Sequence, residues 1–193
     1  MTTEISLIRH GTPEGGNLYR GNTIDDALSE TGWQQMHGAV AAITPWDIVI
    51  SSPMQRCLAF AEDYASQHQL NVIVEDDLKE IGFGVWEGFS SKQILDKDPQ
   101  AIKNFYRDPI MFKPENAEPV AVFQQRVSQV LERILTQQKD KRILVVAHAG
   151  VIRAAISATM KAPPEAMYKI SVGNAAIITI RDDGIRPPTL ICT

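Results

Sequence analysis

The sequence lacks the features that would place its 193 residues in a specialised class of protein. It has two cysteines, Cys57 and Cys192, and neither has the C-x-x-C spacing of a zinc or dithiol site. No apolar run approaches the length of a membrane-spanning helix, and residues 1–4 lack the basic and apolar regions of a signal peptide. We therefore expect a cytoplasmic protein with reduced thiols, and Cys57, inside an apolar helical pattern, as a buried packing residue.

A surplus of positive charge is also missing. The chain has 19 Lys and Arg against 23 Asp and Glu, a formal net charge of −4. Because nucleic acids and anionic membranes require clustered surplus cations, we expect neither as a partner. The 44% hydrophobic and 22% charged residues are typical of a globular chain that can bury a core without disulfides or a metal. We predict one domain over residues 1–193, and the sequence leaves open a monomer or a homodimer.

Short apolar runs alternate with helical patterns along the chain. Strands are expected at 4–9, 47–51, 72–74, 142–147 and 175–180, and helices between Ser29 and Pro45 and at about 53–67, 119–139 and 151–160. This alternation predicts an α/β fold with a mostly parallel sheet and helices on both faces.

Residues 78–118 break the alternation, and with two short helical segments they are typical of a cap over an active site. Most of the cap aromatics are expected to pack it against the body, and one or two to line a pocket. The six are Phe83, Trp86, Phe89, Phe105, Tyr106 and Phe112.

Polar side chains follow three of the predicted strands. Arg9 and His10 follow the first strand, Arg56 begins the helix after the second, and His148 follows the strand at 142–147. Since the carboxyl ends of parallel strands meet at one edge of a sheet, we expect these side chains to lie together. Either histidine taken alone could equally be structural, but two arginines beside them indicate a pocket for a dianion. Their charges would repel a metal ion, and no G-x-S-x-G elbow is present for a serine-type triad.

Four spaced motifs carry a family resemblance. They are Arg9-His10-Gly11-Thr12, Ser51-Ser52-Pro53 with Arg56, the segment from Leu78 to Gly88, and Ala147-His148-Ala149-Gly150-Val151-Ile152-Arg153. In this order they resemble the histidine phosphatase superfamily, which includes cofactor-dependent phosphoglycerate mutases. Within it the chain is most similar to small phosphatases typified by α-ribazole phosphatase, an enzyme of cobalamin biosynthesis. The resemblance implies a three-layer α/β/α fold of the phosphoglycerate mutase type and a phosphohistidine intermediate, with no metal and no cofactor.

The resemblance also implies roles for the matching residues. His10 would be the nucleophile that accepts the phosphoryl group, and Arg9, Arg56 and His148 would hold its oxygens. Glu80 would protonate the leaving alkoxide and then take a proton from the attacking water, although without its motif Glu80 would be interpreted as a solvated loop carboxylate. His10 must attack as a neutral imidazole, whereas His148 would act best as a cation.

A second group of residues is expected to contact the substrate: Thr12, Asn17, Arg20, Gly21 and Ala149. Many relatives carry a phosphate-binding asparagine where this chain has Gly16, so Asn17 is the expected substitute. Arg20 could reach the pocket or lie at the surface. The serine that relatives place before the long helix is missing from Asn116-Ala117-Glu118-Pro119.

These features predict a phosphomonoesterase that hydrolyses a small phosphorylated substrate. The cap aromatics suit a ring-bearing leaving group such as that of α-ribazole 5'-phosphate. Two alternatives stay open, a phosphoglycerate mutase-type phosphoryl transfer and a non-catalytic binder of a phosphorylated ligand. Mutases of the family are generally longer, and the full set of site residues argues against a binder.

Overall fold

The computed structural model describes residues 2–43 and 45–192. Within these ranges six strands form one sheet in the order β3-β2-β4-β1-β5-β6. The strands are β1 (Thr3–Arg9), β2 (Ile48–Ser51), β3 (Val72–Val74), β4 (Arg142–Ala147), β5 (Ile177–Asp182) and β6 (Thr189–Ile191). The first four run parallel, whereas β5 is antiparallel to β1 and β6 to β5. The mostly parallel sheet is confirmed.

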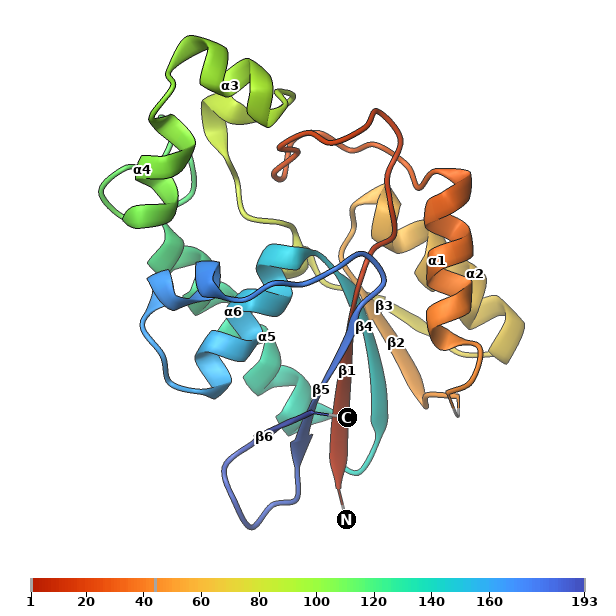
Figure 1. The fold of residues 1–193 in the computed structure, drawn as a ribbon. Helices are drawn as coiled ribbons and strands as arrows, with labels where there is room; N and C mark the ends of the chain where they lie inside the picture. The colour runs from red at the N-terminus through yellow and green to blue at the C-terminus, as the bar shows by residue number, and fades with distance from the viewer. Residues whose placement is uncertain (1, 44, 193) are drawn as a thin grey trace.

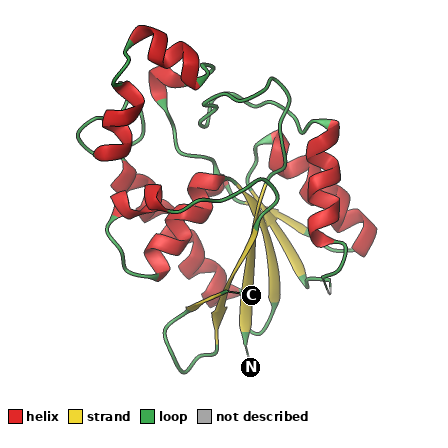
Figure 2. Ribbon diagram, viewed as in Figure 1, coloured by secondary structure: helices red, strands yellow, loops and turns green. Residues whose placement is uncertain are grey.

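Helices cover both faces of the sheet (Figures 1 and 2). They are α1 (Glu30–Val40) and α2 (Gln55–His68) on one face, and α5 (Val120–Gln137) and α6 (Ala149–Thr159) on the other. Along β4, Ile143, Val145 and Ala147 belong to the core that includes α5 and α6. Leu144 and Val146 belong to the core that includes α1 and α2. This burial on both faces explains the uninterrupted apolar run and confirms the three-layer α/β/α fold.

Two helix ends differ from their predicted positions. Helix α1 ends at Val40, short of the break expected at Pro45, and Thr44 lies outside the described residues. Helix α6 begins at Ala149, two residues earlier than the periodicity predicts, so its first turn follows His148 directly. The backbone N–H groups of that turn therefore face the carboxyl edge of the sheet.

The last strands lie at one edge of the sheet. Strand β5 begins at Ile177 rather than at Ala175, because Ala175 has a φ of 56°, outside the extended region. The short strand β6, which the sequence patterns did not predict, follows Pro187 and Pro188 and pairs with β5 at the edge of the sheet, where prolines are tolerated. None of the helices formed by the described residues is long and apolar enough to cross a membrane.

Residues 78–118 lie beyond the carboxyl ends of the parallel strands and contain α3 (Ser91–Lys97) and α4 (Ala101–Arg107) (Figure 1). Trp86, Ile94 and Phe105 form a small buried core of this segment. Phe83 and Tyr106 instead line a cavity. The expected division of the aromatics between packing and pocket is confirmed.

Candidate active site

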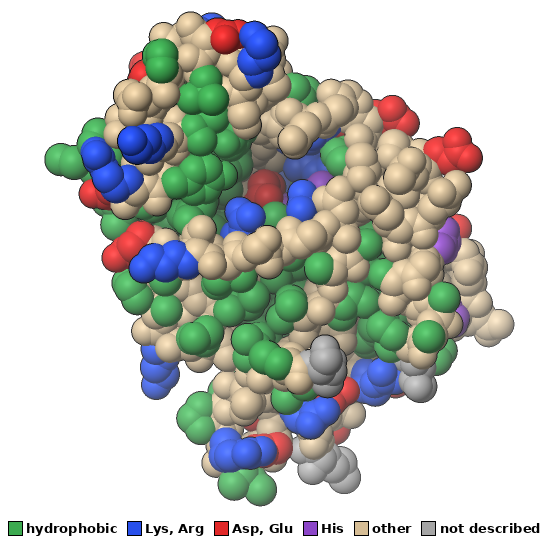
Figure 3. Space-filling model, viewed as in Figure 1, with side chains coloured by type: hydrophobic (Ala, Val, Ile, Leu, Met, Phe, Trp, Pro, Cys, Tyr) green, Lys and Arg blue, Asp and Glu red, His purple; other side chains and the backbone are tan. Residues whose placement is uncertain are grey.

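A cavity of about 730 Å³ opens at the carboxyl edge of the sheet, beside the cap. Figure 3 shows the hollow, with basic and acidic side chains on its floor. Arg9, Arg20, Arg56 and Arg153 line it, and Glu80 is the one carboxylate among the described lining residues. Its size suits a small molecule, and its excess of arginines suits an anion.

His10 lies at the start of the loop after β1 and is 7% exposed. Its Nδ1 lies 2.7 Å from the carbonyl oxygen of Gly11, so a proton on Nδ1 donates there and leaves Nε2 with a free lone pair. Burial, followed by the charge of Arg56, lowers the pKa of His10 to about 3. The imidazole is therefore neutral at pH 7, the state that the predicted nucleophilic role requires.

His148 is fully buried beside His10, and the two ring centroids are 5.3 Å apart. Its Nε2 lies 2.8 Å from Oγ of Ser52 and 3.6 Å from Sγ of Cys57, which is buried as expected. Burial, and then the charge of Arg56, holds the pKa of His148 well below its usual range. The expectation of a cationic His148 is therefore wrong for this arrangement, because burial and the nearby positive charges, that of Arg56 first, all disfavour the charged form. A dianion bound beside it would raise the pKa again.

Arg9 and Arg56 carry donors that the protein leaves unused. Nη1 of Arg56 donates to the carbonyl of Ile24 at 2.9 Å and Nη2 to that of Gly21 at 3.1 Å. Nη1 of Arg9 donates to the carbonyl of Val172 at 2.7 Å. The Nε atoms of both arginines are buried without a hydrogen-bond partner among the described residues. Since a buried donor without an acceptor is costly, these atoms are suited to an anion in the cavity.

Arg20 lines the cavity and is 8% exposed. Of the two positions that the sequence left open, the pocket and the surface, the structure shows the pocket for Arg20. Its Nε pairs with Asp26 at 2.8 Å, and its Nη2 donates to the carbonyls of Glu14 and Gly16. Arg20 therefore also holds the loop after His10 in shape. Asn17, on the same loop, is exposed at the cavity mouth.

Gly21 lies where that loop meets the cap. Its φ is 56°, and a Cβ there would overlap the carboxylate of Glu87. Glu87 accepts hydrogen bonds from the backbone N–H of Phe83 at 2.7 Å and from that of Thr23 at 3.1 Å. A glycine is thus required for the close approach that ties the loop to the cap.

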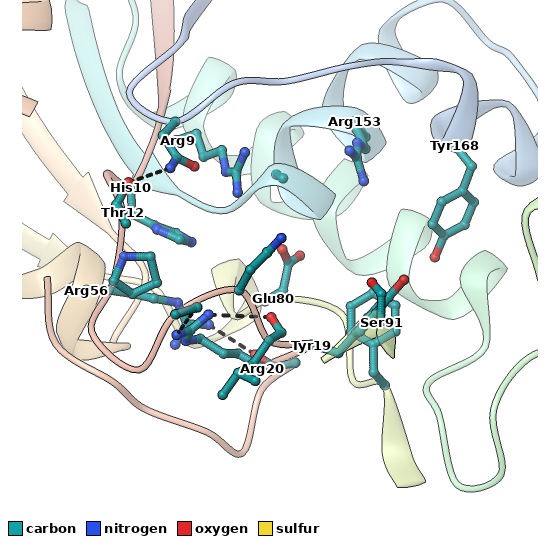
Figure 4. Close-up of a pocket in the computed structure, with 18 of the residues that line it drawn as sticks. Arg9, His10, Thr12, Tyr19, Arg20, Arg56, Glu80, Ser91, Arg153 and Tyr168 are labelled. Atoms are coloured by element: carbon teal, nitrogen blue, oxygen red, sulfur yellow. Dashed lines mark hydrogen bonds between the residues drawn. The ribbon is translucent and has the colours of Figure 1, made fainter. Parts of the chain in front are cut away.

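Glu80 is held by backbone amides. Its Oε1 accepts from Ile81 N at 3.0 Å and its Oε2 from Gly150 N, in the first turn of α6, at 3.2 Å. A Cβ at residue 150 would overlap this carboxylate, which explains the glycine of the last motif. Glu80 is therefore a fixed group, and its carboxylate lies between His10 and Arg153 in Figure 4.

Thr12 and Ala149 complete the expected set. Thr12 N donates to the side chain of Gln35 at 2.9 Å, and Asn174 Nδ2 donates to Thr12 Oγ1 at 2.8 Å. Of the ten expected site residues, all line the cavity except His148, which packs behind its floor against His10. Their chemical roles stay predictions. No three His, Cys, Asp or Glu side chains in residues 2–43 and 45–192 cluster as metal ligands would.

The similarity to a known protein family extends over almost the whole chain. The family model of the histidine phosphatase superfamily (branch 1) matches residues 5–189. The chain belongs to this superfamily.

The chain has relatives of several lengths, and it spans about half the length of the first curated relatives it matches. A bifunctional protein of Mycobacterium tuberculosis is 28% identical over 179 residues, which are 91% of this chain and 49% of the relative. The adenosylcobalamin/alpha-ribazole phosphatase of Escherichia coli is 30% identical over 171 residues, 86% of this chain and 83% of that enzyme. A solved structure of Entamoeba histolytica phosphoserine phosphatase with 3-phosphoglyceric acid has a TM-score of 0.83 at 28% identity, covering 98% of this chain and 95% of that chain.

Two residues that the sequence left without a role, Arg126 and Glu118, hold the Glu80 segment. Arg126, on α5, pairs with both carboxylate oxygens of Glu118 at 2.8 and 2.9 Å. It also donates to the carbonyls of Asp77 at 2.6 Å and Glu80 at 3.2 Å. Glu118 in turn accepts from Gly82 N at 3.2 Å. Arg126 gave no sequence signal because it occupies the polar face of a helix, where arginine is common.

Two residues that line the cavity, Arg153 and Tyr168, were also left without a role by the sequence. Arg153 ends the motif that contains His148, so its place in that motif was an available signal. Tyr168 lies in a 3₁₀ helix, Pro164–Lys169, whose composition carries no functional pattern.

Proposed function

We propose that this histidine phosphatase is a metal-independent phosphomonoesterase that hydrolyses a small organic phosphate through a phosphohistidine at His10. The observation that carries the proposal is a buried, neutral imidazole beside two arginines whose Nε donors have no partner among the described residues. A neutral imidazole supplies the nucleophile, and the arginines supply fixed positive charge for the phosphoryl oxygens.

The first step is in-line displacement at phosphorus. Nε2 of His10 forms a bond to phosphorus while the bond from phosphorus to the ester oxygen breaks. Arg9 and Arg56 stabilise the charge on the equatorial oxygens. Protonated Glu80 gives its proton to the leaving alkoxide, which departs as an alcohol.

The second step regenerates the enzyme. Water attacks phosphorus as the bond to His10 breaks, and the Glu80 carboxylate takes the proton of the water. Inorganic phosphate leaves, and His10 returns to the neutral imidazole. The two backbone N–H groups that bind Glu80 keep its carboxyl near the reacting oxygen through both steps.

α-Ribazole 5'-phosphate is the first substrate to test within this proposal. Tyr19, Phe83 and Tyr106 line the cavity and could contact a ring-bearing leaving group. The similarity to the Escherichia coli adenosylcobalamin/alpha-ribazole phosphatase supports the same choice.

The test is to trap the intermediate. Rapid acid-free quenching during turnover of an aryl phosphate, followed by peptide mass spectrometry, is expected to find the phosphoryl group on His10. His10→Ala should abolish both the adduct and turnover, whereas His68→Ala, on α2 away from the cavity, should retain both.

Treatment with EDTA should leave the wild type active. EDTA-sensitive turnover, or an adduct on another residue, would overturn the proposal. With phosphoglycerates as substrates, isomer formation without phosphate release would identify a mutase instead. Tight phosphate binding with no hydrolysis of any ester would identify a binder.

A further inference from the structure

We propose that Arg153 and Tyr168 form a binding site for a carboxylate on the leaving group, so that this enzyme prefers phosphate esters of hydroxy acids. This inference rests on the proposed phosphomonoesterase function and names its substrate class.

The first observation is where unsatisfied polar atoms lie. Among the described residues, the buried side-chain polar atoms without a hydrogen-bond partner are Nε of Arg9, Nε of Arg56, Nε of Arg153 and the Tyr168 hydroxyl. All four residues line the same cavity. Because buried polar groups are nearly always paired, four orphans around one cavity indicate groups that a ligand satisfies. Arg9 and Arg56 are assigned to the phosphoryl group, which leaves Arg153 and Tyr168 unexplained.

The second observation is their position relative to the reacting atoms. In Figure 4, Arg153 and Tyr168 lie on the far side of Glu80 from His10. In-line displacement requires the leaving group opposite His10, and Glu80 must reach its oxygen. Arg153 lies three residues after Gly150, whose N–H binds Glu80, so both are on the same face of α6. The body of the leaving group therefore extends toward Arg153 and Tyr168.

Their chemistry selects a carboxylate. Burial, followed by the charge of Glu80, raises the pKa of Tyr168, so its hydroxyl keeps the proton and can donate. Arg153 adds one positive charge, and its guanidinium matches a carboxylate with two parallel hydrogen bonds. One cation and one hydroxyl suit a monoanion, whereas three arginines line the phosphate end, where a dianion is expected. An uncharged ring such as that of α-ribazole would leave both donors unpaired, so esters of hydroxy acids are favoured over the α-ribazole 5'-phosphate named as the first substrate to test.

The experiment compares two pairs of esters. O-Phosphoserine and O-phosphoethanolamine differ only in the carboxylate, and fructose 1,6-bisphosphate and fructose 6-phosphate differ in a second phosphate. We expect wild-type kcat/KM to favour phosphoserine over phosphoethanolamine by about 10- to 100-fold, the range of a charge-assisted hydrogen-bonded pair. Arg153→Gln should bring this ratio near one, and Arg153→Lys should restore part of it. Tyr168→Phe should lower it a few-fold.

Arg186→Gln is the matched control, because Arg186 is 72% exposed and pairs with Asp183 in a C-terminal turn. It should keep the wild-type ratio. A wild-type ratio near one, a ratio unchanged by Arg153→Gln, or a larger effect of Arg153→Gln on the bisphosphate pair would overturn the carboxylate assignment. Hydrolysis of phosphoethanolamine with no preference would leave the phosphatase function standing.

If no ester is hydrolysed, the proposed function fails and the binding site is tested without turnover. Calorimetric titration then measures the binding of phosphoserine and phosphoethanolamine to the wild type and to Arg153→Gln. A carboxylate site requires that the wild type bind phosphoserine more tightly and that Arg153→Gln remove this preference.

Discussion

The two ends of the cavity draw their side chains from different parts of the fold. At the phosphate end, Arg9 is the last residue of β1 and His10 follows it, and the backbone N–H of His10 donates to the carbonyl of Ala147 on β4 at 2.9 Å. At the leaving-group end, Tyr19 comes from the loop after β1, Tyr106 from α4 of the cap, Tyr168 from a 3₁₀ helix and Arg153 from α6. The edge of the sheet thus holds Arg9 and His10, whereas the groups proposed for recognition come from α6, the cap and irregular segments.

The phosphate end and the cap also differ in how tightly their residues are packed. The strand residues beneath the phosphate end, Leu7, Val145 and Ala147, are fully buried in a core shared with two long helices. The core of the cap is small, and Tyr106 on it is half exposed. Segments with few buried apolar contacts open at a lower free energy than the sheet. Substitutions at the phosphate end should therefore reduce the chemical step itself, and those at the leaving-group end should change the choice of substrate.

After the loss of activity expected for His10→Ala, the largest effect is expected at Arg56. Arg56→Met should lower kcat/KM for an aryl phosphate by about 10²- to 10³-fold, because it removes a donor to the phosphoryl oxygens. It should also destabilise the fold by about 1–3 kcal/mol, because the carbonyls of Gly21 and Ile24 lose their partner. Initial rates and urea unfolding measure the two effects. A loss of stability with activity retained would place Arg56 in the scaffold only.

A smaller effect tests whether Glu80 belongs to the fixed end. Arg126→Met removes the donor to the carbonyls of Asp77 and Glu80, so the carboxyl of Glu80 should shift. We expect kcat to fall about 10- to 100-fold with KM little changed, because the shift affects proton transfer and not binding. Arg133→Met, on the same helix and 41% exposed, is the control. The distinguishing measurement uses aryl phosphates of increasing leaving-group acidity. If Arg126→Met has lost proton donation, its rates should approach those of the wild type as the leaving group becomes more acidic, because an acidic leaving group needs no proton.

The smallest effect concerns pH. The pKa of His10 is about 3 in the folded state against an ordinary value of 6.5, so below pH 6.5 the unfolded chain binds a proton that the folded chain does not. The free energy of unfolding should therefore fall as the pH drops, by about 2 kcal/mol from His10 between pH 7 and pH 5. Urea unfolding of wild type and His10→Gln at both pH values measures this. Equal pH dependence in the two proteins would show that the phosphate end does not hold His10 neutral.

Local patterns were enough to predict five of the six described strands and most of the phosphate end, but not β6. The apolar run at Ile143 to Ala147 indicated a fully buried strand, and the positions of His10, Arg56 and His148 after three different predicted strands placed them at one edge. The protonation of His148 was not predictable in this way, because it depends on complete burial and on the nearby charge of Arg56. Arg126 was missed for a related reason, since its five hydrogen bonds go to a segment about 40 to 50 residues away and to Glu118.

The sequence by itself determined the order of the elements, because hydrophobic periodicity and turn residues act over a few positions. It also determined which residues could do chemistry, because the guanidinium of Arg9, the imidazole of His10 and the carboxyl of Glu80 are set by residue type alone. Only the tertiary structure decided the charge state of the two histidines and which donors lack a partner. Desolvation and hydrogen-bond satisfaction are properties of the packed chain, in which side chains such as Arg153 and Tyr168, distant from His10 in sequence, share one cavity.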